Sequence, residues 1–362
     1  MLCPFCLRDA PKFSPTDATL ASGKSIKSFV CPDAECGEII PPLYNREYSA
    51  YPPLPLLVVG TRGHGKTLYF SALLHALRNA DLGRYWPKFS VSPINTEAFT
   101  TVFETLERLE DMDLPRATPS STFPRPGLLQ LGPPPFHDGS TVLLYDIGGE
   151  VFESPDKILD YASFVRAAPF VLFVVSISDL PSSPTGRAAA LDKLLAIYIN
   201  GVSTLGGERK RQDLVVLYTK AEAVDQLAQP PWNDIGDYAD MDFAEDPPSS
   251  GAYGYNMLQI SKRLREFTRE VLGAANFVSA AEGWFRSVEF CAVSALGARP
   301  TADNRLSQPL APRRVIDPLL FLMQKDRQNR AKDADRSRPS AQPAKDASKA
   351  GSSRSRRRFP WT

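Results

Sequence analysis

Residues 60–67 read GTRGHGKT and fit the pattern G-x-x-x-x-G-K-[ST], in which a glycine-rich turn surrounds phosphate groups. An apolar run at Leu54–Val59 precedes the stretch and predicts a buried strand. Leu68–Arg78 follows it, with apolar residues at helical spacing. In a strand–turn–helix arrangement of this kind, successive backbone N–H groups of the turn surround an anion. The helix then points the positive end of its dipole at the same anion. Because a chance glycine turn would rarely have both flanking elements, we predict a phosphate-binding loop.

The residues of this loop have distinct expected roles. Lys66 would reach the β- and γ-phosphates of a nucleoside triphosphate, and the Thr67 hydroxyl would ligate Mg²⁺. The loop backbone supplies the remaining predicted phosphate contacts, from Gly60, Gly63, Gly65 and Leu68. The stretch therefore predicts that the chain binds a nucleoside triphosphate.

The composition is that of a soluble globular protein. At 362 residues the chain can hold one large α/β domain with small appendages, and its hydrophobic content of 43% is ordinary. No apolar run approaches the ~18–20 residues of a membrane span, and the N-terminus lacks the charged-then-apolar pattern of a secretion signal. We expect a cytoplasmic protein without a transmembrane segment.

Four of the five cysteines precede the loop as two close pairs, Cys3-x₂-Cys6 and Cys31-x₄-Cys36. Two such pairs on a short segment can assemble the tetrahedral thiolate site of a zinc ribbon, with no open position for catalysis. Two disulfides, or reduced cysteines without a metal, are the alternatives. A module of about 40 residues is too small to hold a core alone, so zinc would supply its folding energy. We predict a structural zinc ribbon at residues 1–42.

The rest of the chain divides by composition. Proline-rich residues 43–53 predict a linker, and residues 54–324 predict the nucleotide-binding domain. Within it, the insert 229–256 holds six acids, five aromatic residues and no Lys or Arg, which fits a solvated loop or a partner-docking loop.

The end of the chain is basic. Residues 325–362 hold twelve Lys and Arg against four Asp, a net charge of +8, so the preceding residues carry −7 of the total +1. We expect this tail to be disordered. It would bind nucleic acid, an anionic surface or an acidic partner, or only keep the chain soluble.

A second motif follows a strand expected at Thr141–Tyr145. Asp146 ends this strand, where an acid holds Mg²⁺ through water, and Gly149 completes a D-x-x-G pattern whose glycine amide can contact the γ-phosphate. At these residues the chain resembles the TRAFAC-class, Ras-like GTPases. The resemblance puts Glu150 where a glutamine usually orients the attacking water. A glutamate there can orient water, but its charge would repel the γ-phosphate and slow hydrolysis.

The same resemblance assigns roles to the loop at 114–126 and to two loop side chains. A threonine at this position, switch I, completes the Mg²⁺ shell, and we favour Thr118 over the competing Thr122 and Thr101. Arg62 stands where Ras-like enzymes usually have glycine, so it acts as an internal arginine finger or is solvated or contacts a partner. His64 is expected to point outward without a role.

Two further elements resemble the guanine-reading motifs of that family. The strand expected at Asp213–Tyr218 is followed by Thr219-Lys220-Ala221-Glu222, which is similar to N/T-K-x-D, with Glu in place of Asp. In the family the lysine stem packs over the base and the carboxylate accepts from guanine N1 and N2. The strand expected at Val288–Ser294 leads into Ser294-Ala295-Leu296, similar to the loop whose amide meets guanine O6. These elements imply guanine rather than adenine.

The order of elements predicts a three-layer α/β domain, with a mostly parallel sheet and one antiparallel edge strand. A Cys₄ ribbon joined to such a domain, with a closing helix at 313–324, resembles the double-GTPase type. That resemblance implies a slow GTPase switch that works beside a second GTPase or an effector in bacterial conflict or antiviral defence systems. The alternatives are a P-loop ATPase, or an adaptor whose ribbon and tail bind nucleic acid or protein while nucleotide is a structural ligand.

Overall fold

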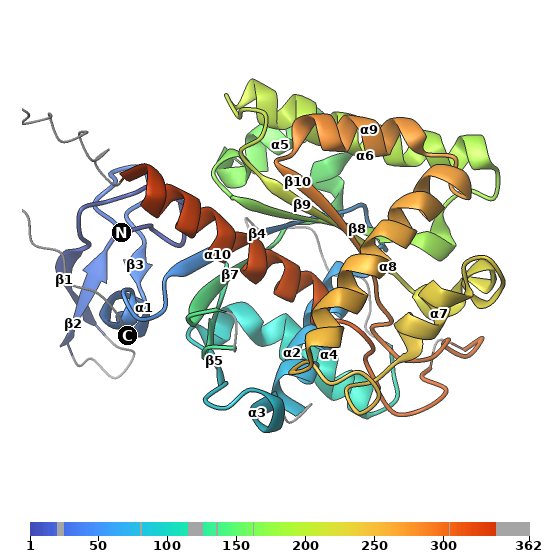
Figure 1. Cartoon of the computed structure of the whole chain (residues 1–362). Helices are drawn as coiled ribbons and strands as arrows, with labels where there is room; N and C mark the ends of the chain where they lie inside the picture. The colour runs from blue at the N-terminus through green and yellow to red at the C-terminus, as the bar shows by residue number, and fades with distance from the viewer. Residues whose placement is uncertain are drawn as a thin grey trace, which may run out of the picture.

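The computed structural model describes residues 1–19, 25–79, 82–114, 126–134, 137–161, 163–303 and 305–337. In these residues a seven-stranded sheet has the order β10-β9-β8-β4-β7-β6-β5 (Figure 1). Its strands are β4 Pro53–Val59, β5 Val91–Pro93, β6 Gly127–Leu131, β7 Ser140–Asp146, β8 Phe170–Ser176, β9 Asp213–Thr219 and β10 Ser287–Ala292. The predicted α/β fold class is confirmed.

The centre of the sheet is parallel, and its strands are mostly apolar. Every residue of β8 and β9 is buried, as parallel strands covered on both faces require. β4 pairs in parallel with β7 and β8, which puts the predicted phosphate loop at the carboxyl end of a central strand. β6 is antiparallel to β7, but it is not the edge strand: β5, which the sequence did not predict, pairs antiparallel with β6 outside it.

Helices cover both faces of the sheet. Figure 1 shows α5, α6 and α9 together on one face and α2, α4 and α10 on the other, and α8 packs beside β10. The helices are α1 Pro42–Glu47, α2 Lys66–Asn79, α3 Leu82–Tyr85, α4 Thr100–Glu110, α5 Pro155–Tyr161, α6 Pro184–Thr204, α7 Asn233–Asp240, α8 Gly251–Glu270, α9 Ala275–Trp284 and α10 Asp317–Ser337. Short 3₁₀ turns include η1 Thr96–Phe99, η2 Gly149–Glu153, η3 Ser163–Arg166, η4 Ile177–Asp179, η5 Ala221–Ala223 and η6 Asp225–Ala228.

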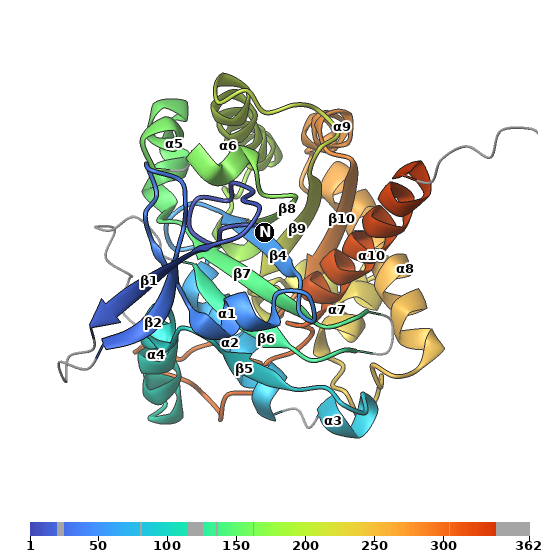
Figure 2. The same cartoon turned by 90° about the vertical axis from the view of Figure 1, so that its left-hand side faces the viewer.

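The N-terminal segment packs against the large domain (Figure 2). Its described residues form a small antiparallel sheet of β1 Ser14–Thr19, β2 Ser25–Val30 and β3 Ile39–Ile40. The Tyr145 hydroxyl of β7 donates to the Pro4 carbonyl at 2.5 Å, and Tyr44 of α1 donates to Leu2 O at 2.8 Å. Buried Cys3 and Tyr44 belong to the same apolar cluster as the central strands. The expected linker therefore includes a helix that joins the two parts.

The acidic insert is folded rather than solvated. Its aromatic side chains at Trp232, Tyr238 and Tyr253 are buried, and only Tyr255 is well exposed, at 63%. α7 and the first turn of α8 lie within the insert, and the Ser250 hydroxyl caps α8 by accepting from Tyr253 N at 3.1 Å. The expectation of a solvated loop was wrong, because the local composition does not show that most of the aromatic residues face the core, and the partner-docking role stays a prediction.

The closing helix is longer than the sequence predicts. α10 starts at Asp317 and continues to Ser337, so residues 325–337 are helical and not part of a disordered tail. Contacts with distant strands fix these turns: Lys325 pairs with Glu289 at 2.9 Å, and Asn329 donates to Asp213 at 2.9 Å. The remaining residues of the predicted tail, 338–362, lie outside the described part of the chain. No helix within the described residues has the length and apolar character needed to cross a membrane.

Candidate nucleotide-binding site

The phosphate loop connects β4 to α2 as predicted. Gly63 and Gly65 have φ angles of 83° and 82°, which side chains rarely tolerate, so glycine is required at both. Lys66 opens α2, and its Nζ donates to Gly60 O at 2.8 Å and Thr61 O at 3.2 Å. The amine therefore lies inside the turn that would surround a phosphate. Arg62, in contrast, is exposed.

His64 points inward, contrary to the expectation from the sequence. Its Nδ1 lies 3.0 Å from Val174 O on β8, and its Nε2 lies 2.7 Å from Thr61 Oγ1. Burial lowers the pKa of this imidazole, which favours the neutral ring that these two contacts need. The side chain fastens the turn of the loop to the neighbouring strand. No local pattern indicates this, because the partner carbonyl comes from a strand 110 residues away.

The D-x-G-G segment lies directly on the phosphate loop. A Cβ atom on Gly149 would come within 2.3 Å of the Arg62 backbone nitrogen, so only glycine allows this approach. Asp146 ends β7 beside Val58 of β4, and Glu150 follows Gly149 in the first turn of η2. The described residues thus bring the segment to the place where a γ-phosphate would lie.

The predicted Mg²⁺ ligands are only partly described. Thr67 lies in the first turn of α2, next to the loop. The Asp146 side chain, Thr118 and Thr122 lie outside the described part, so their predicted roles stay predictions. Thr101 is an exposed residue of α4.

Thr219 joins the first base-reading element to the phosphate loop. Its side chain is buried, and its hydroxyl donates to His64 O at 3.0 Å and lies 3.4 Å from Val175 O. The two motifs are 155 residues apart in sequence. Their contact sets the distance between the position for phosphates and the position for a base.

Lys220 has an ion partner that the sequence analysis missed. Its backbone is left-handed, with φ 58°, and its Nζ lies 2.5 Å from Asp179 Oδ2. Although burial alone would raise the pKa of Asp179, hydrogen bonds from Lys220 and Ser176 lower it. Asp179 follows β8 and Lys220 follows β9. Because the carboxyl ends of parallel strands meet at one edge of a sheet, these positions could have predicted that the two side chains lie close together. The pair is half-exposed, so it orients the lysine more than it stabilises the fold.

Glu222 and Ser294 come together although 71 residues separate them in the sequence. Ala221 N donates to Val293 O at 3.2 Å, which holds the two segments together. Burial raises the pKa of the Glu222 carboxyl, although the Ser294 hydroxyl opposes this rise. Within the described residues, Glu222 Oε2 is buried and has no hydrogen-bond partner. Such an acceptor is costly unless a ligand donates to it, and guanine N1–H and N2–H are donors of the required kind. Ala295, next to Ser294, is buried at the same place.

The four N-terminal cysteines form a group with the geometry of a zinc site. Their Sγ atoms all lie within 4.8 Å of one another, with Cys3 to Cys36 at 3.8 Å and Cys6 to Cys31 at 3.9 Å. A tetrahedral ion with Zn–S bonds of about 2.3 Å separates its sulfurs by roughly 3.8 Å. Phe5 N donates to Cys3 Sγ at 3.4 Å, as in a zinc knuckle. The cysteines are free thiols, so the disulfide alternative is wrong, and the donor set fits zinc.

The sheet order, the phosphate loop and the two segments predicted to read the base, which meet at the same edge, define the chain as a P-loop protein of the GTPase type. The chain belongs to the Double-GTPase 2 family, whose model matches residues 55–246. No curated protein matches the chain.

Among solved structures, the chain is similar to the GTPase-like domain of S. cerevisiae Ski7 bound to GTP. The identity is 16%, the TM-score is 0.35, and the match covers 78% of this chain and 52% of that one. It is also similar to the bacterial selenocysteine-specific elongation factor EF-Sec, with 11% identity, a TM-score of 0.28 and coverage of 80% and 29%. The chain thus spans about half of the first structure and less than a third of the second.

Proposed function

We propose that this protein binds GTP, hydrolyses it slowly and acts as a nucleotide-dependent switch. The observation that carries the proposal is the buried, unpartnered Oε2 of Glu222, held beside Ser294 at the edge of the sheet that bears the phosphate loop. Membership of the Double-GTPase 2 family supports guanine as the base. Nucleotide extracted from the purified protein and separated by chromatography is expected to be GDP or GTP. Adenine nucleotide alone would favour the ATPase alternative.

Each part of the nucleotide has a proposed set of contacts. Lys66 and the backbone amides of the loop hold the phosphates. The stem of Lys220 packs over the base while Glu222 accepts from it. Thr67, with Asp146 and Thr118, would hold Mg²⁺, which stabilises the charge that develops on the γ-phosphate.

Slow hydrolysis follows from the chemistry at Glu150. A carboxylate near the γ-phosphate can orient water, but like charges repel, so the attack is less favourable than with a neutral amide. Arg62 is exposed beside this segment, and its charge helps to lower the pKa of Glu153, after the larger effect of Lys157. We propose that Arg62 supplies positive charge to the transition state when a partner orders it.

The switch function needs segments that respond to the γ-phosphate. Gly149 and η2 lie against the phosphate loop, so a γ-phosphate that enters there changes their contacts. We further propose that the partner is a second GTPase or an effector of a bacterial defence system, as the family resemblance implies. Crosslinking of the GTP-loaded and GDP-loaded protein to a co-expressed candidate tests this. Equal capture in both states would contradict a switch.

We propose a structural zinc ion for the ribbon, held by Cys3, Cys6, Cys31 and Cys36. Its first knuckle faces the large domain, where Pro4 O accepts from Tyr145, so this part of the ribbon is not available to read nucleic acid. The ion would order the ribbon against β7. Elemental analysis of the purified protein is expected to give one zinc per chain.

A further inference from the structure

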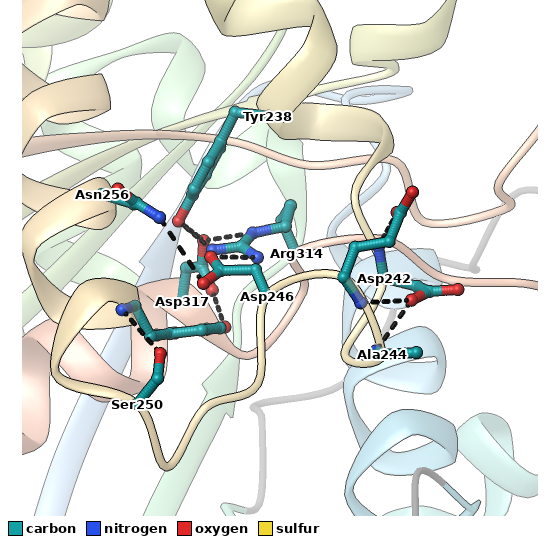
Figure 3. Close-up of polar contacts among 10 residues, drawn as sticks. Tyr238, Asp242, Ala244, Asp246, Ser250, Asn256, Arg314 and Asp317 are labelled. Carbon is teal, nitrogen blue, oxygen red and sulfur yellow. Dashed lines mark hydrogen bonds and ion pairs between the residues drawn. The ribbon is translucent and has the colours of Figure 1, made fainter.

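The folded insert encloses a buried arginine, Arg314, which has no role in the function proposed above. The Arg314 side chain is 0% exposed, and its guanidinium donates to Asp317 Oδ2 and Asp246 Oδ2, each at 3.1 Å (Figure 3). The Tyr238 hydroxyl of α7 accepts from it as well. Asp246 belongs to the insert and Asp317 starts α10, so one side chain connects the insert to the closing helix.

Two tyrosines complete this cluster. The guanidinium lies over the rings of Tyr238 and Tyr253, 3.7 Å and 4.5 Å from their centroids. Both hydroxyls also donate to the Asp317 carboxylate, at 2.7 Å and 2.5 Å. The stability of a buried charge cluster depends on each of its hydrogen bonds, because a group that loses its partner stays buried without water to replace it. The insert therefore fixes the backbone at Arg314 with several mutually dependent contacts.

The residues just before Arg314 pair with the second base-reading element. Arg313 N donates to Ser294 O at 2.8 Å, and Ser294 N donates to Arg313 O at 3.2 Å. Ala311 N donates to Leu296 O at 3.1 Å, which continues the pairing along the loop. The loop after β10 is thus held by the segment that Arg314 anchors. Because Val293 O accepts from Ala221 N at 3.2 Å, the connection reaches the turn that carries Glu222, whose carboxylate is proposed to read guanine.

We propose that Arg314 is a positioning residue for base recognition, and that the acidic insert is the clamp that holds it. The clamp sets the place of Ser294 and of the adjoining Val293 and, through Val293, of the turn whose Glu222 carboxylate accepts from a guanine base. This inference rests on the proposed function. It also assigns a role to the insert, whose Tyr238 and Tyr253 rings are buried against Arg314.

The test separates base binding from phosphate binding in the full chain. Tyr253→Phe keeps the ring over the guanidinium and removes one donor to Asp317, so the clamp loosens while the fold is retained. We expect the Kd for Mg²⁺–GTP to rise about fivefold or more, which is the lower end of the typical coupling between two sites. The Kd for inorganic tripolyphosphate, which reaches only the phosphate loop, stays unchanged. Arg314→Lys, which cannot reproduce the planar fork, is expected to have a larger effect of the same kind.

A matched control distinguishes positioning from general stability. Tyr198→Phe also removes a buried hydroxyl, one that donates to Gln212 at 3.0 Å and touches neither the insert nor the base-reading loop. It should lower Tm while leaving both Kd values unchanged. The proposal is overturned if Tyr253→Phe loses Tm like the control but binds GTP as wild type does, or if it weakens both ligands equally. If wild type binds tripolyphosphate as tightly as GTP, no base is read, and the proposed function fails together with the clamp.

Discussion

Replacement of Tyr145 by phenylalanine tests whether the ribbon and the nucleotide domain form one folded unit. The Tyr145 ring is fully buried, and its hydroxyl makes a 2.5 Å bond to Pro4 O in the first zinc knuckle. Tyr145→Phe keeps the ring but leaves that buried carbonyl without this donor. Such a loss costs about 1–3 kcal/mol of unfolding free energy. At roughly 2–4 °C per kcal/mol for a domain of 150–250 residues, we expect Tm to fall by several degrees.

Thermal unfolding with and without a zinc chelator provides the assay. If zinc orders the knuckle, its removal releases Pro4 from Tyr145, so the substitution should have little further effect on the chelated protein. The two perturbations would then be non-additive, as for groups in one network. The reasoning is refuted if Tyr145→Phe lowers Tm equally with and without the chelator. An unchanged Tm in untreated protein would also refute it, because the bond would then contribute nothing.

Three further predictions concern the nucleotide site. Gly149→Ala puts a Cβ within 2.3 Å of the Arg62 backbone nitrogen, so it should displace the D-x-G-G segment and weaken GTP binding at least about tenfold in calorimetry. Burial raises the pKa of Glu222, and guanine needs the carboxylate, so GTP affinity should fall as the pH drops through that raised pKa. Glu222→Gln should flatten this dependence of Kd on pH. Glu150→Gln removes the charge that repels the γ-phosphate, so phosphate release at saturating GTP should be faster; an unchanged or slower rate would contradict this role.

The sequence predicts the elements whose signal is local. The phosphate loop and the buried strands β4 and β9 follow from a short motif and from apolar runs, and the structure confirms the fold class they imply. The family match also bears out the resemblance to the double-GTPase type.

The features that the sequence did not predict depend on long-range contacts. His64 points inward because its ring contacts the Val174 carbonyl, 110 residues away in the sequence. Arg314 donates to Asp246, which is 68 residues away. In the insert, the buried aromatic residues and the exposed one share the same acidic segment, so the local sequence does not distinguish Tyr253 from Tyr255. The polar composition of the last turns of α10 predicts disorder. In the structure these turns are ordered because Lys325 and Asn329 contact Glu289 and Asp213 on neighbouring strands. In each case tertiary contacts override local composition.

The most direct test of the account is calorimetric titration of the full chain with GTP, GDP and ATP in the presence of Mg²⁺. We predict binding of both guanine nucleotides, ATP binding at least about tenfold weaker, and loss of all binding in Lys66→Ala, whose side chain lies inside the phosphate loop. Equal affinity for ATP and GTP would contradict the assignment of Glu222 and Ser294 to guanine. Binding that survives Lys66→Ala would contradict the site itself.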